Sequence, residues 1–323
     1  MKTLIYGSGP VGRYYTSLLQ RASKDVTLLA RGYTYQNLQE QGIVLVDGFT
    51  GRKETVPIKV TDKFDPEENY DLVVVPMQKS SRLAVCPDLG QYEQIPNILF
   101  IGNDVSIFYQ YFEFLTKEKV LLGFPGVGGG IENNALIYAD RSKPKGPRNP
   151  LYIGEIDGIA RERTHRIKAL FESAGVPVSI EKDIDGWLKY HFAFIAPIVG
   201  IYFKCNKDFE SIKADADAIR TYLRATREAG NVLRAAGYWR RQPFMFNLYY
   251  WLPEWLNIQI FRDKFFGSRF VEIGMGMHAN SIGPELGELV EEFRLIQKVT
   301  AIETPYLDEL LSYIPQSSIV ANT

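Results

Sequence analysis

The first thirty-one residues constrain the fold more than any other stretch of the chain. They contain an apolar segment at residues 3–6, the loop Gly7-Ser8-Gly9-Pro10-Val11-Gly12, a helical pattern at 13–21 and a second apolar segment at 26–30. A strand, G-x-G-x-x-G, a helix and a strand in this order form the dinucleotide-binding fingerprint. The alternative interpretation of the loop is an ordinary turn between a strand and a helix.

Each glycine of the loop has a physical reason. Gly7 allows the tight turn, Gly9 lets the backbone approach a pyrophosphate, and Gly12 lets the helix pack closely on the strand. The helix start offers N–H groups and the positive end of its dipole to the phosphates. We therefore expect the six residues from Gly7 to Gly12 to bind the phosphates of a dinucleotide.

The end of the second strand predicts which dinucleotide is bound. An NAD site usually carries Asp or Glu there, because a carboxylate accepts hydrogen bonds from the ribose 2′-OH. Here the strand ends in Ala30-Arg31-Gly32, without an acidic residue. A guanidinium suits a 2′-phosphate, which it binds with charge-assisted and often bidentate hydrogen bonds. We predict that Arg31 selects NADP; the alternative is a solvated arginine at a strand end.

Composition excludes several classes of function. A chain of 323 residues is long enough for two domains, and a net charge of −1 gives no sign of a nucleic-acid partner. Two cysteines and three scattered histidines predict neither a disulfide framework nor a metal site. The longest uncharged apolar run, residues 192–203, contains a proline and is too short to span a bilayer. Without a signal-peptide pattern at the N-terminus, we expect a soluble, cytoplasmic protein.

Polar residues follow two strands that the sequence predicts to be buried on both faces. Residues 71–75 and 97–101 are apolar runs of this kind, and the first of them is rich in valine. In open α/β sheets, ligands bind beyond the carboxyl ends of the strands. Gln78, Lys79 and Asn103 are therefore expected near the cofactor. Further strands are predicted at 43–46, 55–60, 120–124, 136–138, 152–154 and 176–180, with helices at 34–41 and 164–173.

Two loops of this region have alternative interpretations. The second glycine cluster, residues 125–130, is interpreted as a bend between strands that keeps the backbone close to the ligand, and alternatively as a phosphate cradle. The Pro-rich basic loop at 140–150 is interpreted as a solvated hairpin, and alternatively as a phosphate site.

Helical patterns replace strand patterns from residue 183 onward. We predict a Rossmann-type, doubly wound parallel α/β sheet over residues 1–182, an all-helical domain for substrate binding or dimerisation over 183–315, and a tail at 316–323. Helices are predicted at 184–203, with a single lysine, and at 209–236, 286–300 and 306–312. The aromatic-rich stretch 238–266 suits core packing, a pocket or lid, a homodimer surface or a membrane-interface patch.

Lys189 is the only charged residue in the apolar stretch 187–203. An ammonium is costly to bury, which favours a functional role. The small residues Ala193 and Ala196 follow one and two helical turns later and are expected to leave space above the lysine. The alternative is a lysine that extends along the helix to solvent. His191 falls on another face and is interpreted as structural.

With these motifs in place, the chain resembles the ketopantoate reductase (2-dehydropantoate 2-reductase) family. The resemblance extends over nearly the whole chain and is strongest at residues 5–12, 28–31, 71–77, 99–103, 152–154 and 187–197. It implies an NADPH-dependent enzyme, associated with pantothenate biosynthesis, that has a Rossmann domain and a helical domain. It also implies that Lys189, in Trp187-Leu188-Lys189, protonates the nascent alkoxide and that Asn103 contacts the nicotinamide ribose and substrate.

The chain departs from the family pattern at the substrate positions. A family lysine falls on Gln78, with Lys79 one residue late, and two substrate-contacting asparagines fall on Ala193 and Ala196. The serine of a later S-x-M region corresponds to Ser268.

The substrate-binding glutamate of the family falls on Asn280, with Glu285 nearby. The cofactor half and the proton donor match the family, whereas the substrate contacts largely do not. We therefore predict an NADP(H)-dependent reductase of a small 2-oxo or other carbonyl compound, with a substrate less polar than ketopantoate. The alternatives are a related dehydrogenase of another carbonyl or an imine, as in opine-type enzymes, and a non-catalytic NADPH-binding sensor.

Overall fold

The computed structural model describes residues 1–105, 108–141, 145–238 and 244–315. The chain divides into two compact units, which are described separately here. Unit 1 comprises Met1–Gly102 and Ile107–Ile184, and unit 2 comprises Asn103–Ser106 and Asp185–Thr323. A short segment after Gly102 therefore groups with the C-terminal part of the chain.

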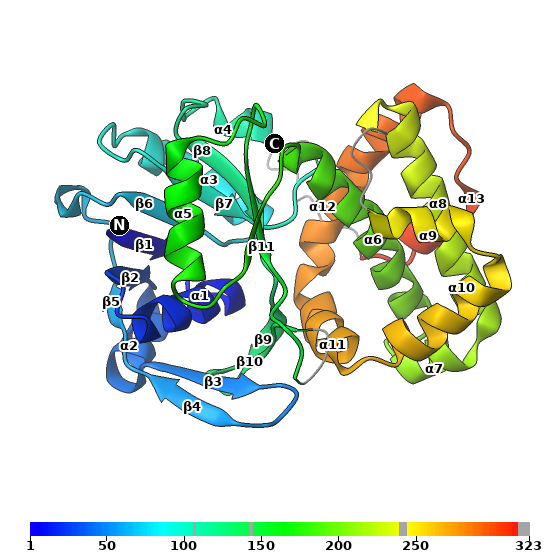
Figure 1. Ribbon diagram of the computed structural model, residues 1–323, viewed down its shortest axis with the longest axis horizontal. Helices are drawn as coiled ribbons and strands as arrows, with labels where there is room; N and C mark the ends of the chain where they lie inside the picture. Colours follow the sequence, from blue (N-terminus) through cyan, green and yellow to red (C-terminus); the bar gives the residue numbers. More distant parts are fainter. Residues whose placement is uncertain (106–107, 142–144, 239–243, 316–323) are drawn as a thin grey trace, which may run out of the picture. The chain divides into compact units, whose positions relative to one another are not determined.

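Unit 1 is built on an eight-stranded sheet of order β12-β11-β8-β7-β6-β1-β2-β5 (Figure 1). All neighbouring strands are parallel except β11 and β8, which are antiparallel, so the predicted parallel sheet has two reversed strands at one edge. The central strands are short, apolar and fully buried. The strands are β1 (Thr3–Tyr6), β2 (Val26–Leu29), β5 (Lys59–Thr61), β6 (Leu72–Val75), β7 (Ile98–Ile101), β8 (Val120–Phe124), β11 (Leu151–Glu155) and β12 (Val178–Ile180).

The helices of unit 1 connect these strands. They are α1 (Pro10–Arg21), α2 (Gly32–Gln41), α3 (Lys79–Gly90), α4 (Phe108–Tyr111) and α5 (Glu162–Glu172), with a short 3₁₀ turn, η1 (Pro66–Glu68). Helix α2 ends at Gly42, whose positive φ of 70° suits glycine. Helix α1 packs between the main sheet and a second sheet.

The second sheet has four strands in the order β4-β3-β10-β9 and was not predicted. Its strands are β3 (Ile43–Asp47), β4 (Lys53–Val56), β9 (Gly128–Glu132) and β10 (Ala135–Ala139). The single strand predicted at 55–60 is wrong, because the chain leaves β4 before Pro57 and enters β5 of the main sheet. Proline has no N–H for strand pairing, which explains the break.

The second glycine cluster is partly a strand, which corrects its interpretation as a bend. A Cβ on Gly129 would lie 2.1 Å from the carbonyl oxygen of Ile137, so glycine is needed for the close pairing of β9 with β10. The glycines serve strand packing here.

The basic loop that follows β10 forms an antiparallel bridge between Arg141 and Arg148, as a hairpin does, but its ends are anchored to the rest of unit 1 rather than solvated. Asp140 is 1% exposed and accepts a hydrogen bond from the hydroxyl of Tyr14, on α1, at 2.7 Å. It also accepts hydrogen bonds from the Nε atoms of Arg141 and Arg148, both at 2.8 Å. Residues 142–144 lie outside the described ranges.

Unit 2 is helical (Figure 1). Its elements are α6 (Ile184–Lys204), α7 (Phe209–Ala214), α8 (Ala216–Ala235), α9 (Phe244–Trp251), α10 (Glu254–Ile260), the π-helix η3 (Phe261–Phe266), α11 (Arg269–Val271), the π-helix η4 (Glu272–Gly276), α12 (Met277–Thr300) and α13 (Pro305–Leu311). The helix predicted at 209–236 is two helices. Asp215 accepts hydrogen bonds from the N–H groups of Asp217 and Ala218 and caps α8, which competes with a continuous helix.

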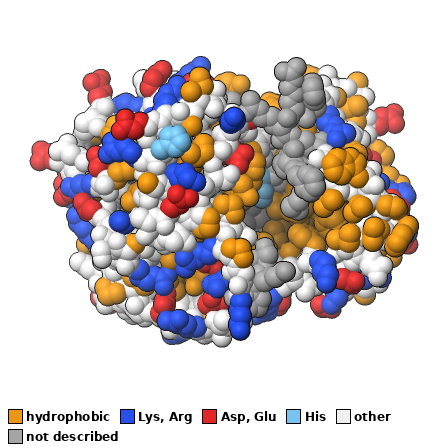
Figure 2. Space-filling view, in the orientation of Figure 1, with side chains coloured by type: hydrophobic (Ala, Val, Ile, Leu, Met, Phe, Trp, Pro, Cys, Tyr) orange, Lys and Arg blue, Asp and Glu red, His pale blue; other side chains and the backbone are white. Residues whose placement is uncertain are grey.

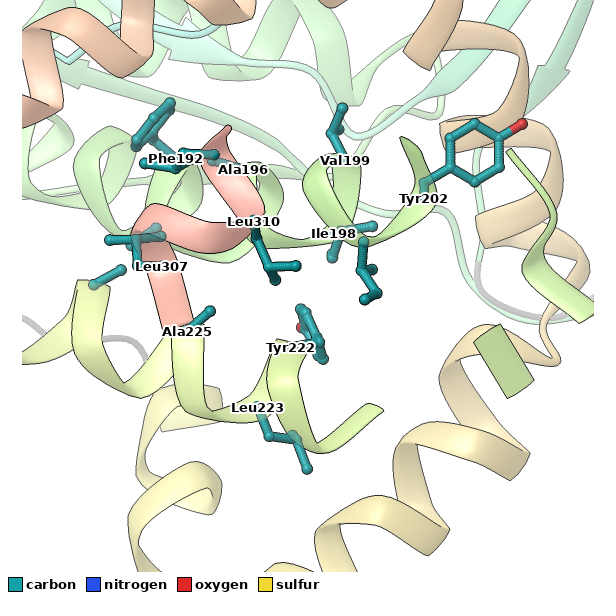
Figure 3. Packing of buried hydrophobic residues seen from close by; sticks show 14 of the residues in the cluster. Phe192, Ala196, Ile198, Val199, Tyr202, Tyr222, Leu223, Ala225, Leu307 and Leu310 are labelled. Atoms are coloured by element: carbon teal, nitrogen blue, oxygen red, sulfur yellow. The ribbon is translucent and has the colours of Figure 1, made fainter. Parts of the chain in front are cut away.

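The core of unit 2 forms where α6, α8 and α13 meet (Figure 3). Figure 3 shows Ile198 of α6 on the side of the helix that faces Leu310 of α13 and Tyr222 of α8. Side chains from the aromatic stretch, including Phe246, Tyr249, Phe261 and Phe266, belong to the same cluster, as the core-packing interpretation predicts.

Other aromatic side chains of that stretch face outward. Trp251 and Trp255 are exposed. Figure 2 shows hydrophobic side chains gathered on one face of unit 2, over α9 and α10. Trp239 lies outside the described residues, as does the tail at 316–323. Within the described ranges, every helix is too short or too polar to cross a membrane. The predicted class, a Rossmann-type α/β region followed by a helical domain, is confirmed.

Candidate active site

The glycine loop joins β1 to α1 and has the form of a phosphate cradle. Gly9 occupies the cap position and Pro10 begins the helix, where its missing N–H costs nothing. A Cβ on Gly9 would meet no atom within 4 Å, so the space above this residue is open. A Cβ on Gly12 would lie 1.9 Å from the carbonyl oxygen of Gly7. The loop therefore has both the close approach and the open backbone that a bound pyrophosphate requires.

Arg13 supports this loop and was not singled out from the sequence. Its side chain is buried, with Nε donating to the carbonyl of Ser8 at 2.9 Å and Nη1 donating to the carbonyl of Asn134 at 3.0 Å. Burial lowers the pKa of its guanidinium. The sequence gives no signal for this role, because an arginine in the first turn of a helix is usually solvated.

Arg31 lies immediately after β2 and is exposed. Its Nη2 donates to the hydroxyl of Tyr6 at 2.8 Å, and its guanidinium carbon is 5.8 Å from the centre of the Tyr6 ring. Tyr6 is the last residue of β1 and pairs in register with Leu29 of β2. A tyrosine that precedes the glycine loop therefore holds the guanidinium at the carboxyl end of the neighbouring strand.

The polar residues after β6 and β7 differ in burial. Gln78 caps α3 and is exposed, whereas Lys79 is the first residue of that helix and is buried. Asn103 is half-buried and follows Gly102 at the end of β7. The buried Arg82 was not predicted to be near this point, yet a Cβ on Gly102 would lie 3.1 Å from its Nη1.

Lys189 lies in α6 with its side chain 4% exposed, which argues against the alternative of a lysine that extends to solvent. Its ammonium forms an ion pair with Asp185, and Nζ is 5.0 Å from the centre of the Tyr238 ring. The apolar stretch considered in the sequence, residues 187–203, begins after Asp185, so this acid was overlooked. The spacing of four residues between the acid and the lysine was a readable signal of the pair.

The two alanines after Lys189 are not at an open surface. Ala193 and Ala196 are fully buried in the apolar cluster of unit 2. Their side chains therefore pack within unit 2. His191 stacks on Trp187 with ring centres 5.3 Å apart, and burial lowers its pKa to about 3. A ring that stays neutral at physiological pH fits the structural interpretation of this histidine.

The remaining substrate candidates lie on the C-terminal helices. Ser268 caps α11, where its hydroxyl accepts a hydrogen bond from the N–H of Val271 at 3.3 Å. Glu285 is buried in α12. Asn280 belongs to the same helix, and its side chain lies outside the described part of the structure. Among the described residues, no group of three or more His, Cys, Asp or Glu side chains is arranged to hold a metal ion.

Comparison with known proteins shows what this chain is similar to. Residues 3–156 match the family described as ketopantoate reductase PanE/ApbA. The uncharacterized oxidoreductase YkpB of Bacillus subtilis (strain 168) is 29% identical over 248 residues, which cover 73% of this chain and 76% of that protein.

Solved structures share the fold over nearly the whole chain. The 2-dehydropantoate 2-reductase of Geobacter metallireducens GS-15 has a TM-score of 0.74 and 18% identity, with 97% of this chain and 99% of that chain covered. The ternary structure of D-mandelate dehydrogenase with NADH and anilino(oxo)acetate has a TM-score of 0.74 and 12% identity, with 97% of both chains covered. Residues 3–156 therefore form a ketopantoate reductase family domain, and the chain shares the fold of solved ketopantoate reductases over nearly its whole length.

Proposed function

We propose that the protein is an NADP(H)-dependent reductase of a small 2-oxo or other carbonyl compound, with Lys189 as the proton donor. The observation that carries this proposal is the burial of Lys189 together with its ion pair to Asp185. Its side chain is almost completely buried, yet its ammonium has a carboxylate partner in Asp185. The proton donor is thus kept out of bulk water and beside a counter-charge.

The residues of the glycine loop would hold the cofactor. Gly7, Gly9 and Gly12 give the backbone shape that suits a pyrophosphate, and the exposed guanidinium of Arg31 suits a 2′-phosphate. Gln78, Lys79 and Asn103 follow the next strands and remain our candidates for further cofactor contacts. When bound, NADPH supplies the hydride that reduces the carbonyl carbon.

The role of Lys189 follows from the charge that develops on the substrate. As the carbonyl carbon gains a hydride, the π electron pair of the C=O bond moves to oxygen. Lys189 transfers a proton from Nζ to that oxygen, which completes the alcohol, and the neutral amine regains a proton from water. We assign Asn103 the role of orienting the substrate through its side-chain amide.

The substrate is proposed to be less polar than ketopantoate. Ala193 and Ala196 stand where the family resemblance implies asparagines, and both are packed among apolar side chains. A site without those hydrogen-bond partners loses much of its discrimination in favour of a polar substrate. Substrates to test therefore include 2-oxo acids with aromatic or aliphatic side chains.

The test is NADPH consumption with ketopantoate and with phenylglyoxylate, comparing the wild type with Lys189→Ala. We expect turnover that falls by about 10²- to 10⁴-fold in the variant. Lys204→Ala is the matched control, because Lys204 lies on the same helix and also pairs with an acid, Glu309. Full activity of Lys189→Ala would contradict the proposed role. Absence of turnover despite NADPH binding to the wild type would favour the sensor alternative.

A further inference from the structure

We propose that Asp185 and Tyr238 are positioning residues that hold the Lys189 ammonium in place for proton transfer. This inference rests on the proposed function and adds two residues to it. Neither residue was a candidate from the sequence.

The three side chains contact one another in a closed arrangement. The Lys189 ammonium donates to Oδ1 of Asp185, and the Tyr238 hydroxyl donates to Oδ2 of the same carboxylate at 3.4 Å. The face of the Tyr238 ring lies 5.0 Å from Nζ of Lys189. Tyr238 follows α8, whereas the other two residues lie on α6, so the arrangement links two segments of unit 2.

Helix geometry explains why Asp185 meets the lysine. Residues four apart lie one above the other on a helix, and side chains lean toward the helix N-terminus. The Lys189 side chain is thereby directed toward the turn that carries Asp185. The same residue spacing on the exposed helix α5 produces the pair Lys168–Glu172, whose side chains are 33% and 44% exposed.

Burial makes the pair at Lys189 different from that exposed pair. Exposed pairs of this spacing contribute little, because water and salt screen them. Lys189 is almost inaccessible to water, so the Asp185 carboxylate is a counter-charge that offsets the desolvation of the ammonium. The ring of Tyr238 adds a favourable cation–π contact.

The positioning role follows from the flexibility of lysine. A lysine side chain has four rotatable bonds and an ammonium with three donors, so burial alone does not fix where Nζ lies. The carboxylate and the ring restrict Nζ from two directions. Such restriction matters because a misplacement of about 1 Å costs roughly 10²-fold in rate.

The first test compares kcat and KM for the carbonyl substrate in four variants. Asp185→Asn and Tyr238→Leu should lower kcat by about tenfold to a hundredfold, with KM for NADPH within about twofold of the wild type. Asp185→Glu should recover part of the loss, and Tyr238→Phe, which keeps the ring, should lose less than Tyr238→Leu. Glu309→Gln is the control, because it removes the acid that pairs with Lys204 on the same helix.

The second test measures the position of the amine without turnover. An amine-reactive acylating reagent is applied at low dose, and labelling of the Lys189 peptide is quantified by mass spectrometry against that of Lys168. We expect labelling of Lys189 to rise several-fold in Asp185→Asn and to stay unchanged in Glu309→Gln.

The outcomes separate this inference from the proposed function. Unchanged kcat in both Asp185→Asn and Tyr238→Leu, together with unchanged Lys189 labelling in Asp185→Asn, would overturn the positioning role. If the wild type reduces no carbonyl compound, the proposed function fails, and the labelling result alone then decides whether the two residues hold the lysine.

Discussion

At the scale of single residues, Arg31 is expected to decide the choice between NADPH and NADH. Its guanidinium is exposed at the end of β2 and is held by a hydrogen bond to Tyr6. Replacing it in Arg31→Asp removes a charge-assisted contact to the 2′-phosphate and introduces repulsion, which should cost about 1.5–3 kcal/mol of NADPH binding. NADH binding should change much less. Titration of cofactor fluorescence with the wild type and variant measures both dissociation constants.

Arg52→Asp is the matched control for this prediction, because Arg52 is also an exposed arginine of unit 1 and makes only a long contact, 3.9 Å, with Glu54. It should leave both dissociation constants unchanged. An NADPH to NADH ratio that stays the same in Arg31→Asp would show that the arginine is an ordinary solvated residue.

The surroundings of some functional residues could be predicted from the sequence, and those of others could not. Lys189 stood out because it is a lone cation in an apolar helix, and the structure finds it buried. Arg13 and Arg82 gave no such signal, since their burial depends on packing between segments distant in sequence. Asp185 was not predicted as a partner of Lys189, although it lies four residues before it, because it precedes the apolar stretch 187–203.

At the scale of elements, two glycines of the loop between β1 and α1 are expected to have different roles. Gly12 is needed for the stability of the fold, and Gly9 is needed for cofactor binding. In Gly12→Ala, the added methyl group would collide with the carbonyl of Gly7, so we expect a lower melting temperature and loss of NADPH binding. In Gly9→Ala, the methyl group enters open space, so the melting temperature should stay near that of the wild type.

Cofactor binding by Gly9→Ala should nevertheless weaken, because the methyl group would occupy the space that a pyrophosphate approaches. Thermal unfolding and cofactor titration of the two variants provide the measurement, with each serving as the control for the other. Equal effects of both substitutions on stability, or full NADPH affinity in Gly9→Ala, would contradict the cradle interpretation of the loop.

Elements with a strong local pattern were predicted well. The strands at residues 3–6 and 120–124 have the predicted bounds, because short apolar runs beside turn residues have few alternatives. Errors arose where one local interaction changed the outcome. Pro57 separates two strands that read as one, and the cap at Asp215 divides a helix whose apolar pattern continues through the break.

At the scale of the whole molecule, the second sheet could not be predicted because its central pair is non-local. Strands β3 and β10 are parallel partners although they lie about ninety residues apart, with Val44 opposite Ala135. No periodicity within either strand specifies that partner. The grouping of Asn103–Ser106 with unit 2 also depends on tertiary contacts that a residue pattern does not contain.

Asp140 connects the parts of unit 1 and is expected to make its stability depend on pH. The carboxylate contacts Tyr14 of α1, and its partner Arg148 also donates to the carbonyl of Gly175 before β12. Burial raises the pKa of Asp140, but hydrogen bonds from Tyr14, Arg141 and Arg148 outweigh this and hold the pKa below its ordinary value.

A carboxyl group whose pKa is lower in the folded state stabilises the fold above its unfolded pKa, and this contribution is lost as the pH falls toward the folded pKa. Asp140→Asn should therefore lower the free energy of unfolding at pH 7 by about 2–4 kcal/mol, and the difference from the wild type should shrink as the pH falls below about 5. Urea denaturation at several pH values measures this difference.

Asp157→Asn, which removes an exposed carboxylate paired with Arg161, should change stability little at pH 7. A difference for Asp140→Asn that does not vary with pH would show that the substitution acts through packing rather than through the charge of Asp140.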